Sequence, residues 1–254
     1  MALPGTFGHH LSMRIAVLSD IHANLTALDA VLADAGAVDR VWQLGDIVGY
    51  GPEPDAVVER LREVGAIGVR GNHDAAACGG SEIDWFNPEA RRAMEWTRRA
   101  ISPETVEWLS SLPSRTVAGA CDLVHGSYRD PLWEYVTSKA VALANLDVLA
   151  DGTRIGLHGH THMPIAFVED AAGLATIRGR AGASLELEGR RALVNPGSVG
   201  QPRDGDPTSS YLIWEPEADR VTWHRVAYDV AGVQRQMRDA GLPTALAARL
   251  SVGL

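Results

Sequence analysis

The sequence predicts an α/β fold, and two features of the chain indicate it. In the first half, short runs rich in β-branched residues alternate with amphipathic helices, which is typical of βαβ units and a largely parallel sheet. In the second half, strand-like runs follow one another across short turns rich in Gly, Pro or Asp, which favours antiparallel pairing. With 254 residues, of which 46% are hydrophobic and 22% charged, the chain has the length and composition of one large domain.

The N-terminal part of the chain predicts three strands separated by two helices. In the first helix Leu25, Leu28 and Val31 recur at helical spacing, and in the second Pro54 stands near the first turn, where proline is tolerated. The strands are expected over residues 14–18, 41–44 and 66–69, and the helices over residues 24–34 and 54–64.

The alternation stops at residues 75–115, where no strand is expected. Asn87 and Ser102 are each followed by Pro and Glu, and a capping residue before Pro and an acid marks the start of a helix. We interpret the segment as an inserted helical hairpin that caps the functional site. Its aromatic side chains usually pack into their own domain at such spacings, but as a group they could stack on a nucleobase. They are Trp85, Phe86, Trp96 and Trp108.

The C-terminal part predicts one helix between two strands and then a series of strands. The last helix is expected to stop at Gly241, with Pro243 just beyond it. The strands are expected over residues 121–124, 154–157, 164–168, 174–177, 191–194, 210–214 and 221–226, and the helices over residues 139–149 and 230–240.

The charge and hydropathy of the chain exclude two classes of partner. The formal net charge is −9 and Lys and Arg form no stripe, so the positive surface that binds a nucleic acid polymer is missing. The aliphatic runs are a few residues long, whereas a helix that spans a membrane needs about 20 residues. Residues 1–12 have neither the basic nor the apolar region of a secretory signal, so we expect a disordered extension over 1–12, a domain over 13–254 and a cytoplasmic protein.

Polar side chains follow five of the predicted strands at their carboxyl ends. In an open α/β sheet these ends share one edge, so segments far apart in the sequence can meet there. Seven of the side chains are oxygen or imidazole donors, which suit borderline divalent metals, and seven donors exceed the needs of one ion. The sequence therefore predicts two divalent metal ions, with the ligands Asp20, His22, Asp46, Asn72, His125, His160 and His162.

These residues resemble the motifs of the calcineurin-like metallophosphoesterases, and Asn195-Pro196-Gly197-Ser198 is similar to a turn of their small bacterial phosphodiesterase branch. The resemblance implies a four-layer α/β/β/α sandwich with two mixed β-sheets. It also implies that Asp46 bridges the two ions. We expect manganese, with iron, zinc, nickel or cobalt as alternatives. The blocks that carry the resemblance are Asp20-x-His22, Gly45-Asp46, Gly71-Asn72-His73-Asp74, His125 and Gly159-His160-Thr161-His162.

By the same resemblance, each ion has its own set of ligands besides the bridge. One ion takes Asp20, His22 and His162 together with Asp46. The other takes Asn72, His125 and His160, again together with Asp46.

One departure from the family's motifs narrows the range of expected substrates. Phosphoprotein phosphatases and symmetrical dinucleoside tetraphosphatases continue their Gly-Asp block with Val-Asp-Arg-Gly, whose Arg clamps phosphate, whereas Ile-Val-Gly-Tyr follows Asp46 here. Without that bidentate Arg, a less charged phosphoryl group is favoured, as in a phosphodiester. Arg70 or Arg203 could replace the clamp, although a surface salt bridge explains Arg70 at least as well.

We therefore expect a metal-dependent phosphodiesterase that hydrolyses a small nucleotide-like phosphodiester by in-line attack of a metal-bridging hydroxide. His73 is the expected general acid, and Asp74 the residue that orients it. An asymmetric dinucleoside polyphosphate hydrolase and a non-catalytic metal-binding scaffold of the same fold are the alternatives. The expected partner is a small phosphate ester or nucleotide, and the sequence leaves open whether the chain forms a homo-oligomer.

Overall fold

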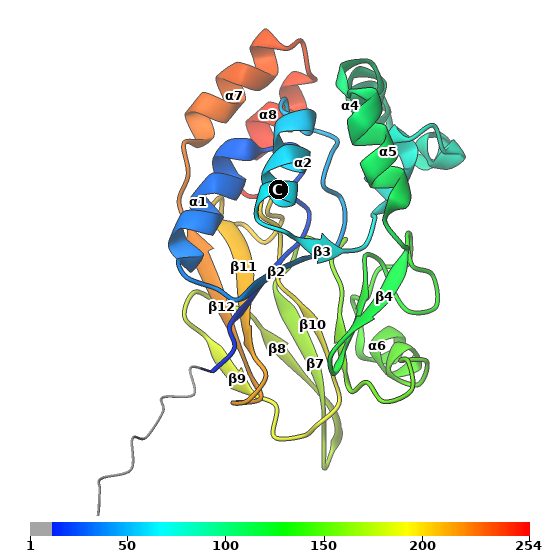
Figure 1. Cartoon of the computed structure of the whole chain (residues 1–254), viewed down its shortest axis with the longest axis vertical. Helices are drawn as coiled ribbons and strands as arrows, with labels where there is room; N and C mark the ends of the chain where they lie inside the picture. Colours follow the sequence, from blue (N-terminus) through cyan, green and yellow to red (C-terminus); the bar gives the residue numbers. More distant parts are fainter. Residues whose placement is uncertain (1–11) are drawn as a thin grey trace, which may run out of the picture.

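Two six-stranded mixed β-sheets form the centre of the computed structural model, which describes residues 12–254 (Figure 1). The first sheet has the order β3 (Ile67–Gly68), β2 (Arg40–Gln43), β1 (Ile15–Leu18), β11 (Ser209–Glu215), β12 (Arg220–Val226) and β9 (Ser184–Glu186). The second has the order β4 (Arg115–Ala118), β5 (Cys121–Val124), β6 (Ile155–Leu157), β10 (Ala192–Asn195), β7 (Ile165–Asp170) and β8 (Gly173–Arg178). As expected, β1, β2 and β3 pair in parallel and β11 with β12 antiparallel.

Helices cover the outer faces of both sheets, so the fold is the predicted α/β/β/α sandwich. Alternation along β1 shows the layers: Ile15 and Val17 pack between the two sheets, while Ala16 and Leu18 pack against the helices. The outer helices are α1 (Leu25–Ala35) and α2 (Pro54–Glu63) on the first sheet and α6 (Lys139–Leu146) on the second (Figure 1). Burial on both faces explains why β1 is continuously apolar.

The expected hairpin is present as α4 (Pro88–Ala100) and α5 (Pro103–Ser111). Asn87 and Ser102 cap these helices as predicted, each accepting a hydrogen bond from a backbone amide three residues on. Met94 and Leu109 are fully buried in the core that also holds α1 and α2. The two helices are therefore packed into the helical layer, and α4 also packs against α7 (Val230–Asp239) and α8 (Thr244–Arg249).

Five elements were not expected from the sequence, and one of them is the 3-10 helix η1 (Ser81–Trp85). Strands β4 and β9 lie at sheet edges and expose part of their side chains, so they lack an apolar pattern. Helix α3 (Asn72–Ala77) begins inside the Gly71-Asn72-His73-Asp74 motif, and the six-residue α8 is too short for a periodic signal. In addition, α6 ends at Leu146, three residues before the expected end.

Three further findings concern membrane-spanning helices, the cysteines and the N-terminal extension. Within residues 12–254, no helix combines the length and the apolar character needed to cross a membrane. Cys78 and Cys121 are free thiols. The expected disordered extension falls on residues 1–11, which lie outside the described part, and on Ser12, whose hydroxyl donates a hydrogen bond to Glu217.

Candidate metal centre

The structure brings all seven predicted donors together at one edge of the two sheets, and all seven are buried. They lie in the loops that follow β1, β2, β5 and β6 and in the first turn of α3. The convergence expected at the carboxyl ends of the strands is therefore present, and it involves both sheets.

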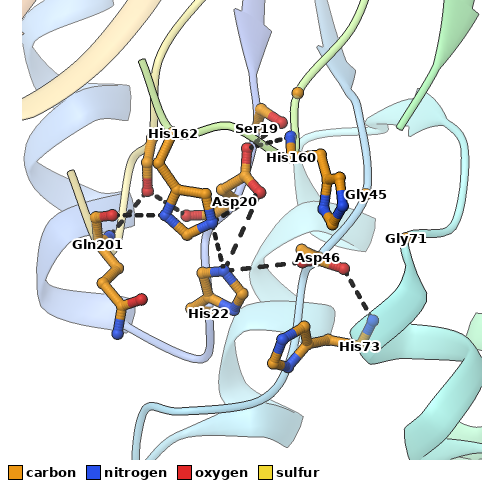
Figure 2. Close-up of polar contacts among 12 residues, drawn as sticks. Ser19, Asp20, His22, Gly45, Asp46, Gly71, His73, His160, His162 and Gln201 are labelled. Atoms are coloured by element: carbon orange, nitrogen blue, oxygen red, sulfur yellow. Dashed lines mark hydrogen bonds and ion pairs between the residues drawn. The ribbon is translucent and has the colours of Figure 1, made fainter. Parts of the chain in front are cut away.

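The first group of donors consists of Asp20, His22, Asp46 and His162. His22 Nε2 lies 3.2 Å from His162 Nε2 and 3.7 Å from Asp46 Oδ2, and His162 Nε2 lies 3.2 Å from Asp20 Oδ1 (Figure 2). Atoms that share a metal ion at about 2.1 Å lie roughly 3–3.5 Å from one another. The spacing in this group therefore suits one ion.

The second group consists of Asp46, Asn72, His125 and His160. His125 Nε2 lies 3.1 Å from Asn72 Oδ1, 3.1 Å from His160 Nδ1 and 3.3 Å from Asp46 Oδ2. Asp46 Oδ2 is thus the atom that approaches both groups. A carboxylate in this position can serve two ions at once.

The hydrogen bonds of the imidazoles determine which of their nitrogens can bind a cation. The Nδ1 atoms of His22, His125 and His162 face backbone carbonyls of Val48, Leu44 and Gln201, which can only accept hydrogen bonds. In the neutral form of each ring, Nδ1 therefore carries the proton and Nε2 presents a lone pair to the site. Lone pairs that face one another in a buried site repel unless a cation lies between them, so this donor set fits divalent metal ions.

In both Asp20 and Asp46 the two carboxylate oxygens have different surroundings. Asp20 Oδ2 accepts hydrogen bonds from the Ser19 hydroxyl at 2.7 Å and from the His160 amide at 3.1 Å, whereas Asp20 Oδ1 is buried without a hydrogen-bond partner. Asp46 Oδ1 accepts from the His73 amide at 2.9 Å (Figure 2). In each residue one oxygen is held by the protein and the other is left for a ligand.

The backbone of the candidate ligands is strained. Asp20, His22, Asp46, His160 and His162 all have φ between 51° and 66°, in the left-handed region that non-glycine residues rarely adopt. Each such conformation costs about 1–3 kcal/mol, and clusters of them mark functional sites. The strain directs five side chains of different loops at one point.

Two glycines beside the site are required for close approach and not for an unusual backbone conformation. A Cβ atom at Gly71 would lie 2.1 Å from Asp46 Oδ1, and one at Gly159 would lie 1.9 Å from Ser19 Oγ. Among the glycines before ligand-bearing turns, Gly45 does have a positive φ of 85°. Gly71 and Gly159 thus make room for the side chains of Asp46 and Ser19.

Burial favours the neutral form of most of the imidazoles. It lowers the pKa of His160 to about 3, and it lowers the pKa of His22 and of His162 as well. His125 differs: burial alone would lower its pKa, but the neighbouring Asp46 raises it to about 9. Neutral imidazole is the form that binds metals, so His125 has a proton to release when an ion binds.

The sequence and structure comparisons place the chain in a family. The sequence profile of the calcineurin-like phosphoesterase superfamily domain matches residues 13–219. The chain belongs to the calcineurin-like phosphoesterases. Phosphoric ester hydrolysis that depends on metal ions is the activity of this family, and the chain is an enzyme of that class.

Three similar proteins each align with most of this phosphoesterase. An uncharacterized protein of Methanocaldococcus jannaschii is 37% identical and covers 94% of this chain and 98% of its own length. The phosphodiesterase YfcE of Escherichia coli is 30% identical and covers 79% of this chain and 87% of its own length. The crystal structure of a metallophosphoesterase from Sphaerobacter thermophilus has a TM-score of 0.88 at 48% identity, covering 96% of this chain and all of that one.

In this phosphoesterase His73 lies beside both groups of donors. Its ring is 4.9 Å from the ring of His22 and stacks on Phe86 at 4.5 Å. It is almost fully buried, and burial lowers its pKa to about 4. Nδ1 has no hydrogen-bond partner and faces Gly49, so Nε2 is the nitrogen that can reach a substrate.

The carboxylate of Asp74 joins two loops of the centre. Its carboxylate accepts hydrogen bonds from the amides of Ile47, Val48 and Gly71, at 2.8–3.1 Å. Among the described hydrogen bonds none joins Asp74 to the His73 ring. Asp74 therefore fixes the loop that follows Asp46 to the turn that precedes Asn72, and the ring of His73 is positioned by aromatic packing instead.

A cavity of about 120 Å³ opens onto the donors, and of the two candidate phosphate clamps only one lines it. Arg203 lines this cavity, and its Nε is buried without a hydrogen-bond partner. Its only described side-chain hydrogen bond goes to Gln201 Oε1 at 3.0 Å. Arg70 does not line the cavity.

Sequence reasoning missed several residues around the centre. The Asn195 amide donates to the Gly159 carbonyl at 2.6 Å and to the Thr161 hydroxyl at 3.1 Å, and so holds the loop that carries His160 and His162. The turn around Asn195 was noticed, but its role depends on contacts with a distant loop. Trp133 and Tyr135 also line the cavity, in a loop without any motif.

Proposed function

We propose that the chain is a dinuclear metal-dependent phosphodiesterase that acts on a small nucleotide-like phosphodiester, with manganese as the preferred ion. The observation that carries this proposal is the position of Asp46 Oδ2, within 3.7 Å of His22 Nε2 and within 3.3 Å of His125 Nε2. A single oxygen between two separate sets of donors suits two ions about 3.5–4 Å apart better than one ion. The similarity to the phosphodiesterase YfcE supports the choice of a diester.

Each side chain has a distinct task in this proposal. One ion would be held by Asp20, His22 and His162, the other would be held by Asn72, His125 and His160, and Asp46 would contribute to both. When bound, two divalent ions supply a hydroxide at neutral pH and neutralise charge on the phosphoryl oxygens.

The protein residues around the ions bind and protonate the substrate. The guanidinium of Arg203, whose Nε has no hydrogen-bond partner, binds one nonbridging phosphoryl oxygen, and a single clamp of this kind suits the single negative charge of a diester. His73 holds a proton at Nε2 and donates it to the leaving oxygen. With a pKa of about 4 in the absence of ions, His73 has to gain that proton together with the anionic substrate.

A substrate panel on manganese-loaded protein tests the proposal. The panel contains bis(p-nitrophenyl) phosphate, p-nitrophenyl phosphate, cyclic nucleotides and diadenosine tetraphosphate. We expect kcat/KM to be highest for a diester, and the Asp46→Asn variant, purified in the same way, to show no activity above background. A higher kcat/KM for p-nitrophenyl phosphate, or equal activity of the variant, would contradict it.

A further inference from the structure

Four aromatic side chains surround the mouth of the metal cavity and form what we call the aromatic rim: Trp85, Phe86, Trp133 and Tyr135. They come from two distant segments, namely the end of the 3-10 helix η1 (Ser81–Trp85) with the residue after it, and the loop between β5 and α6. The Trp133 ring lies 5.5 Å from the ring of Trp85 and 5.8 Å from the ring of Phe86, so the two segments meet in one cluster.

The inner members of the rim contact the candidate catalytic residues directly. Tyr135 stacks on the ring of His160 at 4.0 Å with an interplanar angle of 11°, and Phe86 stacks on His73. Trp133 meets His160 edge-on at 6.4 Å. A group bound at the rim is therefore adjacent to a phosphoryl group bound at the metals.

Two members of the rim expose much of their surface. Trp85 is 74% exposed and Tyr135 is 47% exposed. The other two tryptophans near the insert behave differently, because Trp96 and Trp108 pack partly buried against core clusters. Exposed aromatic surface gathered at a cavity mouth is typical of a ligand-binding site.

The volume of the cavity shows where the organic part of a substrate has to lie. Its 120 Å³ is well below the roughly 300–1,000 Å³ of pockets that enclose a drug-sized ligand. The cavity can hold a phosphoryl group, but a nucleoside attached to that group has to extend through the mouth. The side chains of the aromatic rim form the walls of this mouth.

We propose that the aromatic rim is the subsite for a nucleobase of the substrate, with Trp85 and Trp133 as the stacking platform. This inference rests on the proposed function for the identity of the reaction. Stacking of a base on an aromatic side chain contributes about 1–3 kcal/mol and tolerates different bases. The rim thus selects nucleotide esters over esters without a base, and it does so with little preference among bases.

Binding of two phosphate monoesters to the manganese-loaded protein tests the subsite. AMP and ribose 5-phosphate share the phosphate and the ribose, and they differ in the base. We expect titration calorimetry to give AMP a Kd about 5- to 150-fold lower, which is the stacking contribution expressed as a ratio. Trp85→Ala and Trp133→Ala should each reduce this ratio toward one.

A control and a second readout separate the possible failures. Trp108→Phe, which changes an indole packed away from the cavity, should leave the ratio as in the original chain, and thermal melts followed by circular dichroism check that all variants fold. Equal affinities for the two ligands in the unmodified protein, or an unchanged ratio in both alanine variants, would overturn the subsite. Phosphate release from AMP in the same samples would contradict the phosphodiesterase proposal, and it would leave the proposal of a nucleobase subsite unaffected.

Discussion

The Nε2 atoms of His22 and His162 lie 3.2 Å apart, and the opposite nitrogen of each ring faces a backbone carbonyl. Both Nε2 atoms therefore present lone pairs, and this arrangement is unfavourable unless a cation lies between them. The native fold creates the arrangement and the unfolded chain does not, so metal binding and folding are coupled.

Removal of the ions should destabilise the protein. We expect two divalent ions per chain by elemental analysis, and a lower melting temperature after chelation, because a ligand present at 100 times its Kd stabilises the native state by about 2.7 kcal/mol. Calorimetric melts with and without chelator measure the change, and re-addition of manganese should reverse it. Full activity with one ion per chain would contradict the dinuclear centre.

Substitution of the two carboxylates should have different effects on metal content. Asp46→Asn should weaken the binding of both ions, since Asp46 Oδ2 approaches both groups of donors. Asp20→Asn should weaken only the binding of the ion at His22 and His162. Metal analysis after dialysis distinguishes the two variants. If Asp46→Asn retained one ion at full occupancy, the bridging role would be wrong.

His73→Ala should lower kcat by about 10²- to 10⁴-fold while both ions stay bound, because the residue donates a proton and does not coordinate. The loss should be larger for a diester with a poor leaving group than for a p-nitrophenyl ester. Equal losses with both substrates would point to stabilisation of charge instead of proton donation.

Arg203→Ala should raise KM and leave the metal content unchanged, because Arg203 lines the cavity and its buried Nε has no hydrogen-bond partner. Arg70→Ala is the matched control, since Arg70 does not line the cavity, and its KM should stay within about twofold of the original, as expected for a change that removes no substrate contact. Arg203→Lys keeps the charge and should recover part of the loss. Identical kinetics of the Arg203→Ala variant and the unmodified protein would exclude a clamp at this position.

Asn195→Ala should lower the free energy of unfolding by about 1–3 kcal/mol, because it leaves the Gly197 amide without its partner and removes one of the two hydrogen bonds to the Gly159 carbonyl. It should also lower metal occupancy, since the loop with His160 and His162 loosens. Ser102→Ala removes the cap of α5, which lies apart from the cavity, and should cost about 0.5–2 kcal/mol with metal content unchanged. Denaturant melts and metal analysis on the two variants make the comparison.

The residues at the ends of the strands could be predicted because local patterns specify them. The apolar run of β1 ends just before Asp20 and His22, and that of β2 just before Asp46, so the type of fold and the candidate donors follow from the order of strands and polar blocks. Capping by Asn87 and Ser102 was equally visible, because a cap depends on the next three residues.

Only the tertiary structure decided how these residues act together. The contacts of Asp74 with Ile47 and Val48, the approach of Asp46 Oδ2 to both groups of donors, and the meeting of Trp85 with Trp133 each join segments that are distant in the sequence. No local periodicity encodes such contacts, because they depend on how neighbouring loops, and in two of the three cases the two sheets, pack together. The sequence by itself determined the fold class and the kinds of donor atoms, whereas packing decided which oxygen is shared, which histidine nitrogen faces the site and which aromatic faces are exposed.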